Sequence, residues 1–240
     1  MEQTQEIAES STPQIDELYF NDIDEMINYL KKHKKHTLVL SVDSYAEKSD
    51  DTMWNANAND GIDRHVKRIG GAMLTNTHTF SGWVFDPQKM DCSDQVEFLR
   101  KTKSTYSKAM GSTNRLLCDR LKKFLKENKV KTIIFWDEGN DYDLSVMEQD
   151  GILDLFKGIK IIFAEKVLTD TTGERNGLPI SYVCALFNIK IRQKKIDERE
   201  LYSAPFFKAQ MIKKIFQTYL YQLNDDSRKH SKTIILNDFA

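Results

Sequence analysis

The sequence predicts an α/β fold in which a mixed sheet is flanked by helices. Residues 37–42 and 131–136 are short apolar runs, rich in β-branched side chains, that are typical of buried strands. Residues 68–75 and 79–85 predict two strands joined by a short turn around Asn76. Strand and helix patterns alternate after these elements. Early antiparallel strands followed by such alternation favour a mixed sheet over an all-helical or all-strand fold.

The predicted elements follow from local periodicity. Leu18, Ile23, Ile27 and Leu30 recur at helical spacing, and the segment begins acidic and ends in the basic run 31–36, as the helix dipole favours. The remaining predictions are helices at 96–99, 116–124 and 144–156, a strand at 159–164, and two helices within 181–223.

Composition indicates one large domain with short extensions. The chain has 240 residues, 40% of them hydrophobic, and a formal net charge of -1, which argues against nucleic-acid binding by bulk charge alone. We predict a flexible tail at 1–16, one domain at 17–223 and a C-terminal tail at 224–240. The polar insert 47–60 is predicted to be a loop without regular structure.

The cysteines indicate a reducing compartment, and the hydropathy pattern argues against a membrane span. The 3 cysteines are far apart, so we expect free thiols, with Cys184 buried in a helix, in a cytoplasmic or nuclear protein. No apolar run is long enough to cross a membrane, and the polar N-terminus does not resemble a secretory signal. No nucleotide-binding or metalloprotease motif occurs, and no cofactor is predicted.

The segment 181–223 carries the strongest resemblance to a known family. Its apolar frame, from Val183 and Cys184 to Ile215 and Leu220, resembles the last motif of the DEDDh (DnaQ-like) exonucleases. The resemblance implies a ribonuclease-H-like fold. In that family the second helix opens with a catalytic histidine and carries a metal-binding aspartate. In this sequence the histidine position holds Tyr202 or Ser203, and the aspartate position holds Phe207 or Lys208.

The first family motif, D-x-E on the first strand, is also incomplete. In the alignment that best matches the strand, Ser41 replaces the aspartate and Asp43 replaces the glutamate. In the other alignment Asp43 is the aspartate and Tyr45 replaces the glutamate. One carboxylate remains in either case, whereas two-metal phosphodiester hydrolysis needs several converging carboxylates.

The middle family motif resembles Tyr142-Asp143-Leu144, where an aspartate follows an aromatic residue at the start of a helix. Asp143 is therefore the second residual metal-site position, beside Asp43. The alternative is that Asp141 or Asp143 only caps the helix. With about two of four ligands and no histidine, the resemblance implies a domain without catalytic residues and without a bound metal.

A second resemblance concerns the function. Residues 80–87 and 182–186 resemble the aromatic strand end and the "Y-C-A-L" helix of the Maelstrom domain, a DnaQ-related fold of small-RNA silencing. The Glu-Cys-His-Cys zinc set of that family has no counterpart at suitable spacing. The size and the loss of both sites resemble a nematode Maelstrom-like RNA-interference factor that acts with a partner protein.

Together these patterns predict a catalytically inactive adaptor or scaffold in RNA interference, which binds a protein partner and single-stranded RNA. A basic run that includes Tyr106 is the candidate RNA contact, with a solvated helix face as the alternative. Trp54 is the candidate partner contact, or else packs back onto the domain. The basic run consists of Arg100, Lys101, Lys103, Tyr106 and Lys108.

Two other functions stay open from the sequence. One is an active ribonuclease with a non-standard metal site that uses Asp43 and Asp143, and the other is a plain nucleic-acid-binding module. None of the five histidines has a nearby motif partner, and His65, within the basic run 64–68, is expected at the surface.

Overall fold

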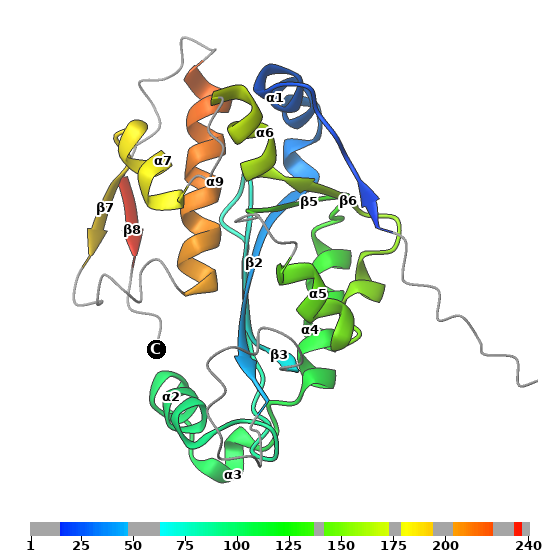
Figure 1. Cartoon of the computed structure of the whole chain (residues 1–240), viewed down its shortest axis with the longest axis vertical. Coiled ribbons are helices and arrows are strands. Elements are labelled where there is room, and N and C mark those ends of the chain that lie inside the picture. The colour runs from blue at the N-terminus through cyan, green and yellow to red at the C-terminus, as the bar shows by residue number, and fades with distance from the viewer. Residues whose placement is uncertain are drawn as a thin grey trace, which may run out of the picture.

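A six-stranded mixed sheet forms the centre of the molecule (Figure 1). The computed structural model describes residues 15–47, 63–136, 142–172, 179–193, 204–222 and 233–236. The strands of the sheet are β1 (Asp16–Glu17), β2 (Thr37–Ala46), β3 (Arg64–Met73), β4 (Thr79–Trp83), β5 (Thr132–Phe135) and β6 (Lys160–Phe163). Their order is β1-β6-β5-β2-β3-β4.

The two halves of the sheet pair differently. β2, β3 and β4 are antiparallel neighbours, whereas β5 lies parallel to β2, β6 parallel to β5, and β1 parallel to β6. This is the predicted arrangement of early antiparallel strands followed by strand–helix alternation. The predicted α/β fold class, a mixed sheet flanked by helices, is confirmed.

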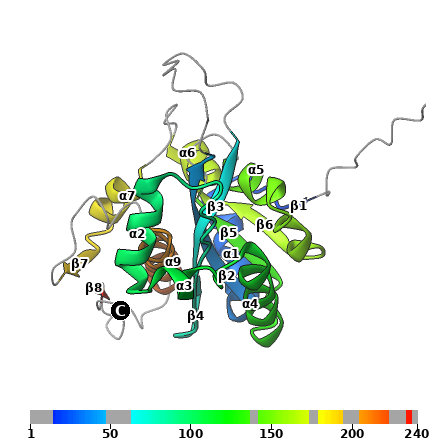
Figure 2. The ribbon, with the colours of Figure 1, turned by 90° about the horizontal axis from the view of Figure 1, so that it is seen from below.

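Helices cover both faces of the sheet (Figure 2). On one face lie α1 (Ile23–His33), α6 (Ala164–Thr172), α7 (Ile180–Leu186) and α9 (Pro205–Gln222). On the other lie α4 (Asn114–Glu127), α5 (Tyr142–Gln149) and the 3-10 turn Leu153–Phe156. The short helices α2 (Cys92–Thr102) and α3 (Tyr106–Ala109) pack beside the far end of β2 and β3, and β7 (Lys190–Gln193) and β8 (Thr233–Leu236) form a separate parallel pair.

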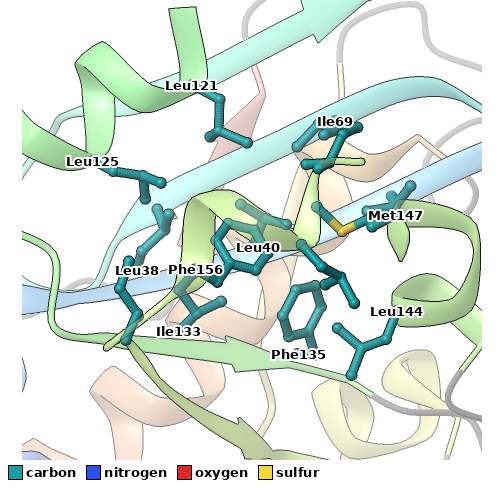
Figure 3. Close-up of a cluster of buried hydrophobic side chains, with 14 of the residues drawn as sticks. Leu38, Leu40, Ile69, Leu121, Leu125, Ile133, Phe135, Leu144, Met147 and Phe156 are labelled. Atoms are coloured by element: carbon teal, nitrogen blue, oxygen red, sulfur yellow. The ribbon is translucent and has the colours of Figure 1, made fainter. Parts of the chain in front are cut away.

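Alternation along β2 assigns its side chains to two hydrophobic clusters. Val39 belongs to the cluster under α9, whereas Leu38 and Leu40 belong to the cluster under α4 and α5, as successive strand residues point to opposite faces (Figure 3). All four residues of β5 are buried, as expected for a strand covered on both faces. A third, smaller cluster, which includes Tyr45, Phe85 and Phe98, lies beneath α2 and α3.

Helix α9 packs tightly against the sheet. Its side chains Ile212, Ile215 and Phe216 are fully buried, and each such side chain contributes roughly 1.5–3 kcal/mol to stability. The start of α9 crosses β3 at Gly70, where an added Cβ would lie 2.1 Å from the backbone nitrogen of Phe206. Only glycine permits this approach of two backbones.

Several predicted boundaries are wrong, each for a local reason. The helix expected over 144–156 ends at Gln149, because Gly151 takes a φ of +70° and a separate 3-10 turn follows. The first helix starts at Ile23 rather than Leu18, because Asp22 caps it by accepting a hydrogen bond from the Glu25 backbone. Helix α6 was not predicted from the sequence, because its apolar stripe is short.

Other expectations are confirmed or lie outside the described residues. Cys184 is buried in α7, and burial raises the pKa of its thiol to about 12. Within the predicted tail 224–240, residues 233–236 form β8 and pair with β7. The predicted loop 47–60 lies outside the described residues except for Glu47.

Replacing Gly70 by alanine tests the contact between α9 and β3. The new methyl group would meet backbone atoms that cannot rotate away, so we expect Gly70→Ala to lower the free energy of unfolding by about 3 kcal/mol or more. Gly111→Ala is the control, because its nearest neighbour would lie 3.4 Å away. Chemical denaturation measures both. Equal stability of the two variants would contradict the close contact.

Candidate functional site

Ser41 and Asp43 lie on the face of β2 that α9 covers. They are two residues apart, so they share a face with Val39, and Ser41 pairs across the strands with Gly70, where α9 begins. Tyr45, the partner of Asp43 in the other alignment, points to the same face and is 4% exposed. The structure therefore places both alternative pairs beside each other on one face of β2.

Ser41 is buried beneath α9. Its residue is 1% exposed, and its hydroxyl has no hydrogen-bond partner among the described residues. A buried hydroxyl without a partner costs stability. The packing of α9 on β2 and β3 therefore covers the Ser41 hydroxyl at the cost of a hydrogen bond.

Asp43 is engaged by an arginine from the neighbouring strand. Its Oδ2 accepts a hydrogen bond from Arg68 Nε at 2.7 Å, and the two residues are paired across β2 and β3. The Arg68 guanidinium also lies 3.9 Å from a carboxylate oxygen of Glu97 and stacks 4.9 Å from the ring centroid of Trp83. The Arg68 guanidinium stays protonated across the physiological pH range.

A second cation extends the cluster to α2. The register of β2 and β3 shifts between Asp43 and Ser44, which makes Lys67 an extra residue in β3. Lys67 is 6% exposed, and its Nζ donates to Asp94 at 2.6 Å and to Glu97. Its contacts tie α2 to the end of the sheet.

The pKa shifts in this cluster favour the charged forms. Burial alone would lower the pKa of Lys67, but hydrogen bonds to Asp94 and Glu97 outweigh it and raise that pKa. Burial alone would raise the pKa of Glu97, but the hydrogen bond from Lys67 and the charges of Lys67 and Arg68 lower it. Two cations, Lys67 and Arg68, therefore pair with three carboxylates, which leaves the cluster with a formal charge of -1.

The other degenerate positions are only partly described. Phe207 is half-buried against the core under α9, its ring centroid 5.8 Å from that of Phe206, and Lys208 is half-buried in the first turns of the helix. Tyr202 and Ser203 lie outside the described residues. Among described residues, no group of three or more His, Cys, Asp and Glu side chains could hold a metal ion.

Asp143 belongs to the first turn of α5, and its side chain lies outside the described part of the structure. The following residues Leu144, Val146 and Met147 pack into the cluster on the α4 side of the sheet. Helix α5 therefore approaches β2 from the face opposite to the one on which Asp43 points.

A buried histidine cluster was not predicted from the sequence. His65 was expected at the surface, but it is 8% exposed, with Nδ1 2.7 Å from Asp150 and Nε2 2.9 Å from Glu47. The three residues come from β3, the end of α5 and the end of β2, so no sequence motif joins them. Burial alone would lower the pKa of His65, but hydrogen bonds with Asp150 and Glu47 raise it.

Lys89 completes this cluster at its exposed side. Its Nζ lies 3.0 Å from His65 Nε2 and 3.6 Å from a Glu47 carboxylate oxygen. A protonated His65 has no lone pair to accept from Lys89, so Lys89 acts by pairing with Glu47. The hydrogen bond with His65 and the charge of Lys89 lower the pKa of Glu47.

The predicted RNA-contact residues gather on α2 and α3. All are exposed except Lys101, which is half-buried, and Tyr106 is 52% exposed with its ring edge-on to Phe85 at 5.4 Å. Trp54, the predicted partner contact, lies outside the described residues. In the part of the chain that the structure describes, no helix is long and apolar enough to span a bilayer.

Comparisons with known proteins add little to this geometry. No protein-family profile and no curated protein sequence matches the chain. Among solved structures, a match is found to a chain of "Structure of yeast NOT1 MIF4G domain co-crystallized with CAF1". The TM-score is 0.42 at 9% identity, and the match covers 90% of each chain. A likeness at this level assigns neither a fold family nor a function.

A double-mutant cycle tests whether Asp43 and Arg68 act as a pair. We expect Asp43→Ala and Arg68→Ala each to lower the free energy of unfolding by about 1–3 kcal/mol, because each leaves a half-buried charge without its partner. The double variant should lose less than the sum, with a coupling energy of about 0.5–3 kcal/mol.

The control is the exposed pair of Lys123 and Glu127, whose charged atoms are 3.8 Å apart. Its alanine variants should show a coupling energy below about 1 kcal/mol, because solvent screens exposed pairs. Purely additive losses at Asp43 and Arg68, measured by urea denaturation, would contradict the pairing.

The histidine cluster predicts a pH-dependent stability. Protonated His65 stabilises the folded state fully below its unfolded pKa of about 6.5, and this contribution is lost as the pH rises through its raised folded pKa. Glu47 contributes above its unfolded pKa, and its contribution is lost as the pH falls through its lowered folded pKa. The stability difference between wild type and His65→Gln should therefore peak between these limits.

Thermal unfolding of both proteins over a pH series measures this difference. It should shrink at alkaline pH, where wild-type His65 is neutral. A difference that stays constant from acidic to alkaline pH would show that His65 contributes by packing alone.

Proposed function

We propose that this chain is a catalytically inactive ribonuclease-H-like domain that acts as an adaptor or scaffold in small-RNA-guided gene silencing. The silencing role rests on the resemblance to Maelstrom domains, and the lack of catalysis rests on the geometry around Asp43. The adaptor would work by binding a protein partner, with single-stranded RNA as a further ligand.

The observation that carries the inactive part of this proposal is the pair of Asp43 and Arg68. Two-metal hydrolysis needs carboxylate oxygens that are free to converge on divalent ions. Asp43 Oδ2 instead accepts from Arg68 Nε at 2.7 Å, and a guanidinium at that distance opposes a divalent cation on the same oxygen.

The surroundings of Ser41 support the same conclusion. The start of α9 lies directly over Gly70, the residue that pairs with Ser41, and Ser41 is 1% exposed. A phosphodiester must reach the reacting groups, and the described contacts leave no room for one above Ser41. In this region α9 packs as part of the hydrophobic core.

The adaptor part is supported by an apolar surface on α7. Residues 178–189 contain no charged residue, although 30% of the chain is charged. Tyr182 and Leu186, one helical turn apart, are 49% and 63% exposed. Adjacent exposed apolar side chains of this kind are typical of protein contact sites.

The alternative function is an active ribonuclease that uses Asp43 and Asp143 in a non-standard metal site. It requires Arg68 to leave Asp43 when metal binds. A nuclease assay with purified protein, labelled single-stranded RNA and Mg²⁺ or Mn²⁺ separates the two functions. We expect no cleavage above the background of an RNA-only sample. Cleavage that Asp43→Asn abolishes, and that Asp154→Asn at an exposed site leaves intact, would overturn the proposal.

A silencing reporter in the native cell supplies the matching in vivo measurement. Asparagine keeps an acceptor for Arg68, so Asp43→Asn should fold and support silencing as well as the wild type. Tyr182→Ser with Leu186→Ser should reduce silencing, because it removes the apolar contact surface of α7. Normal silencing by the α7 variant would contradict the role of that surface.

A further inference from the structure

Helices α2 and α3 present an unusual charge distribution. From residue 98 to residue 118 the chain contains five basic residues and no acidic one, a segment of +5 in a chain of net charge -1. The acidic residues that precede it in α2, Asp94 and Glu97, are turned inward and bonded to Lys67. Asp94 and Glu97 therefore face Lys67, and the C-terminal half of α2 carries Arg100 and Lys101 with no acidic residue.

Apolar side chains are exposed within this positive surface. Tyr106 and Met110 are 52% and 50% exposed, and they are adjacent on one turn, because the Met110 amide donates to the Tyr106 carbonyl at 3.1 Å. Val96 is 62% exposed on α2 and lies one helical turn before Arg100. Lys103 and Lys108 flank Tyr106 in sequence and are exposed.

The surface is rigid beneath these residues. Phe98 and Ala109 are each 1% exposed and join α2 and α3 to the cluster around Phe85 and Met90. The Tyr106 ring packs perpendicular to the Phe85 ring and is still 52% exposed. A fixed aromatic ring loses little conformational entropy on binding and suits a binding anchor.

We propose that this surface, formed by Val96, Arg100, Lys103, Tyr106, Lys108 and Met110, docks an acidic segment of a partner protein that also carries aromatic or aliphatic side chains. Charge complementarity to Arg100, Lys103 and Lys108 requires an acidic ligand. The exposed valine and methionine favour a protein over RNA, because nucleic-acid interfaces are the more polar class, whereas methionine, tyrosine and arginine are enriched in protein interfaces. This inference rests on the proposed adaptor function and names its partner class.

Selection from a random peptide library on the immobilised full-length chain tests the proposal. We expect the enriched peptides to combine Asp or Glu with aromatic or aliphatic residues. Their affinity, measured by fluorescence anisotropy, should fall at least about tenfold in Lys103→Glu with Lys108→Glu, and also in Tyr106→Ala. Circular dichroism checks that each variant is folded.

The matched control is Lys122→Glu with Lys126→Glu, which changes the net charge by the same amount on the exposed side of α4 and should leave the affinity unchanged. Labelled oligouridylate is the competing ligand. If it binds and is lost in Lys103→Glu with Lys108→Glu while no acidic peptide is enriched, the surface binds RNA and the proposal is overturned. Enrichment of neither ligand, or peptides that bind the variants equally, also overturns it.

These outcomes are independent of the nuclease assay. Peptide binding by a chain that also cleaves RNA would refute the inactive domain and keep the docking surface. A chain that neither cleaves RNA nor binds peptide would keep the inactive domain and refute the docking surface.

Discussion

The close approach of α9 to β2 and β3 is the contact on which the candidate site depends. It brings the backbone of Pro205 and Phe206 against Gly70, at a distance that no other residue type at position 70 permits. The contact covers Ser41, fixes the first turn of α9 over the antiparallel half of the sheet, and aligns the buried stripe of Ile212, Ile215 and Phe216 with the core. These elements enclose a packed interior.

The ionic cluster beyond the end of α9 has a separate role. Lys67 and Arg68 are consecutive in β3, yet they hold carboxylates from different elements, Asp43 on β2 and Asp94 and Glu97 on α2. These bonds orient α2 with its acidic side toward the sheet. The position of the surface charge on α2 and α3 is therefore a consequence of which carboxylates the two buried cations bind.

The sequence carries enough information for the sheet and for the residual motif positions. Apolar runs predicted the central strands, because a buried strand must be apolar at nearly every position, and the spacing of Ser41 and Asp43 placed both on one face. The histidine cluster could not be predicted, since Glu47, His65 and Asp150 meet only after folding. The register shift at Asp43 and Ser44 was equally hidden, because a β-bulge leaves no periodic signal in a short strand.

The unsatisfied hydroxyl of Ser41 shows what this position cannot accept. A carboxylate placed here would be buried beneath α9 without a partner, at a cost of several kcal/mol. Arg68 would still hold the neighbouring carboxylate, and Gly70 would still keep the helix in place. A single carboxylate added on this face is therefore destabilising by itself. A metal site on this face would require Ser41, Arg68 and the packing of α9 to change together.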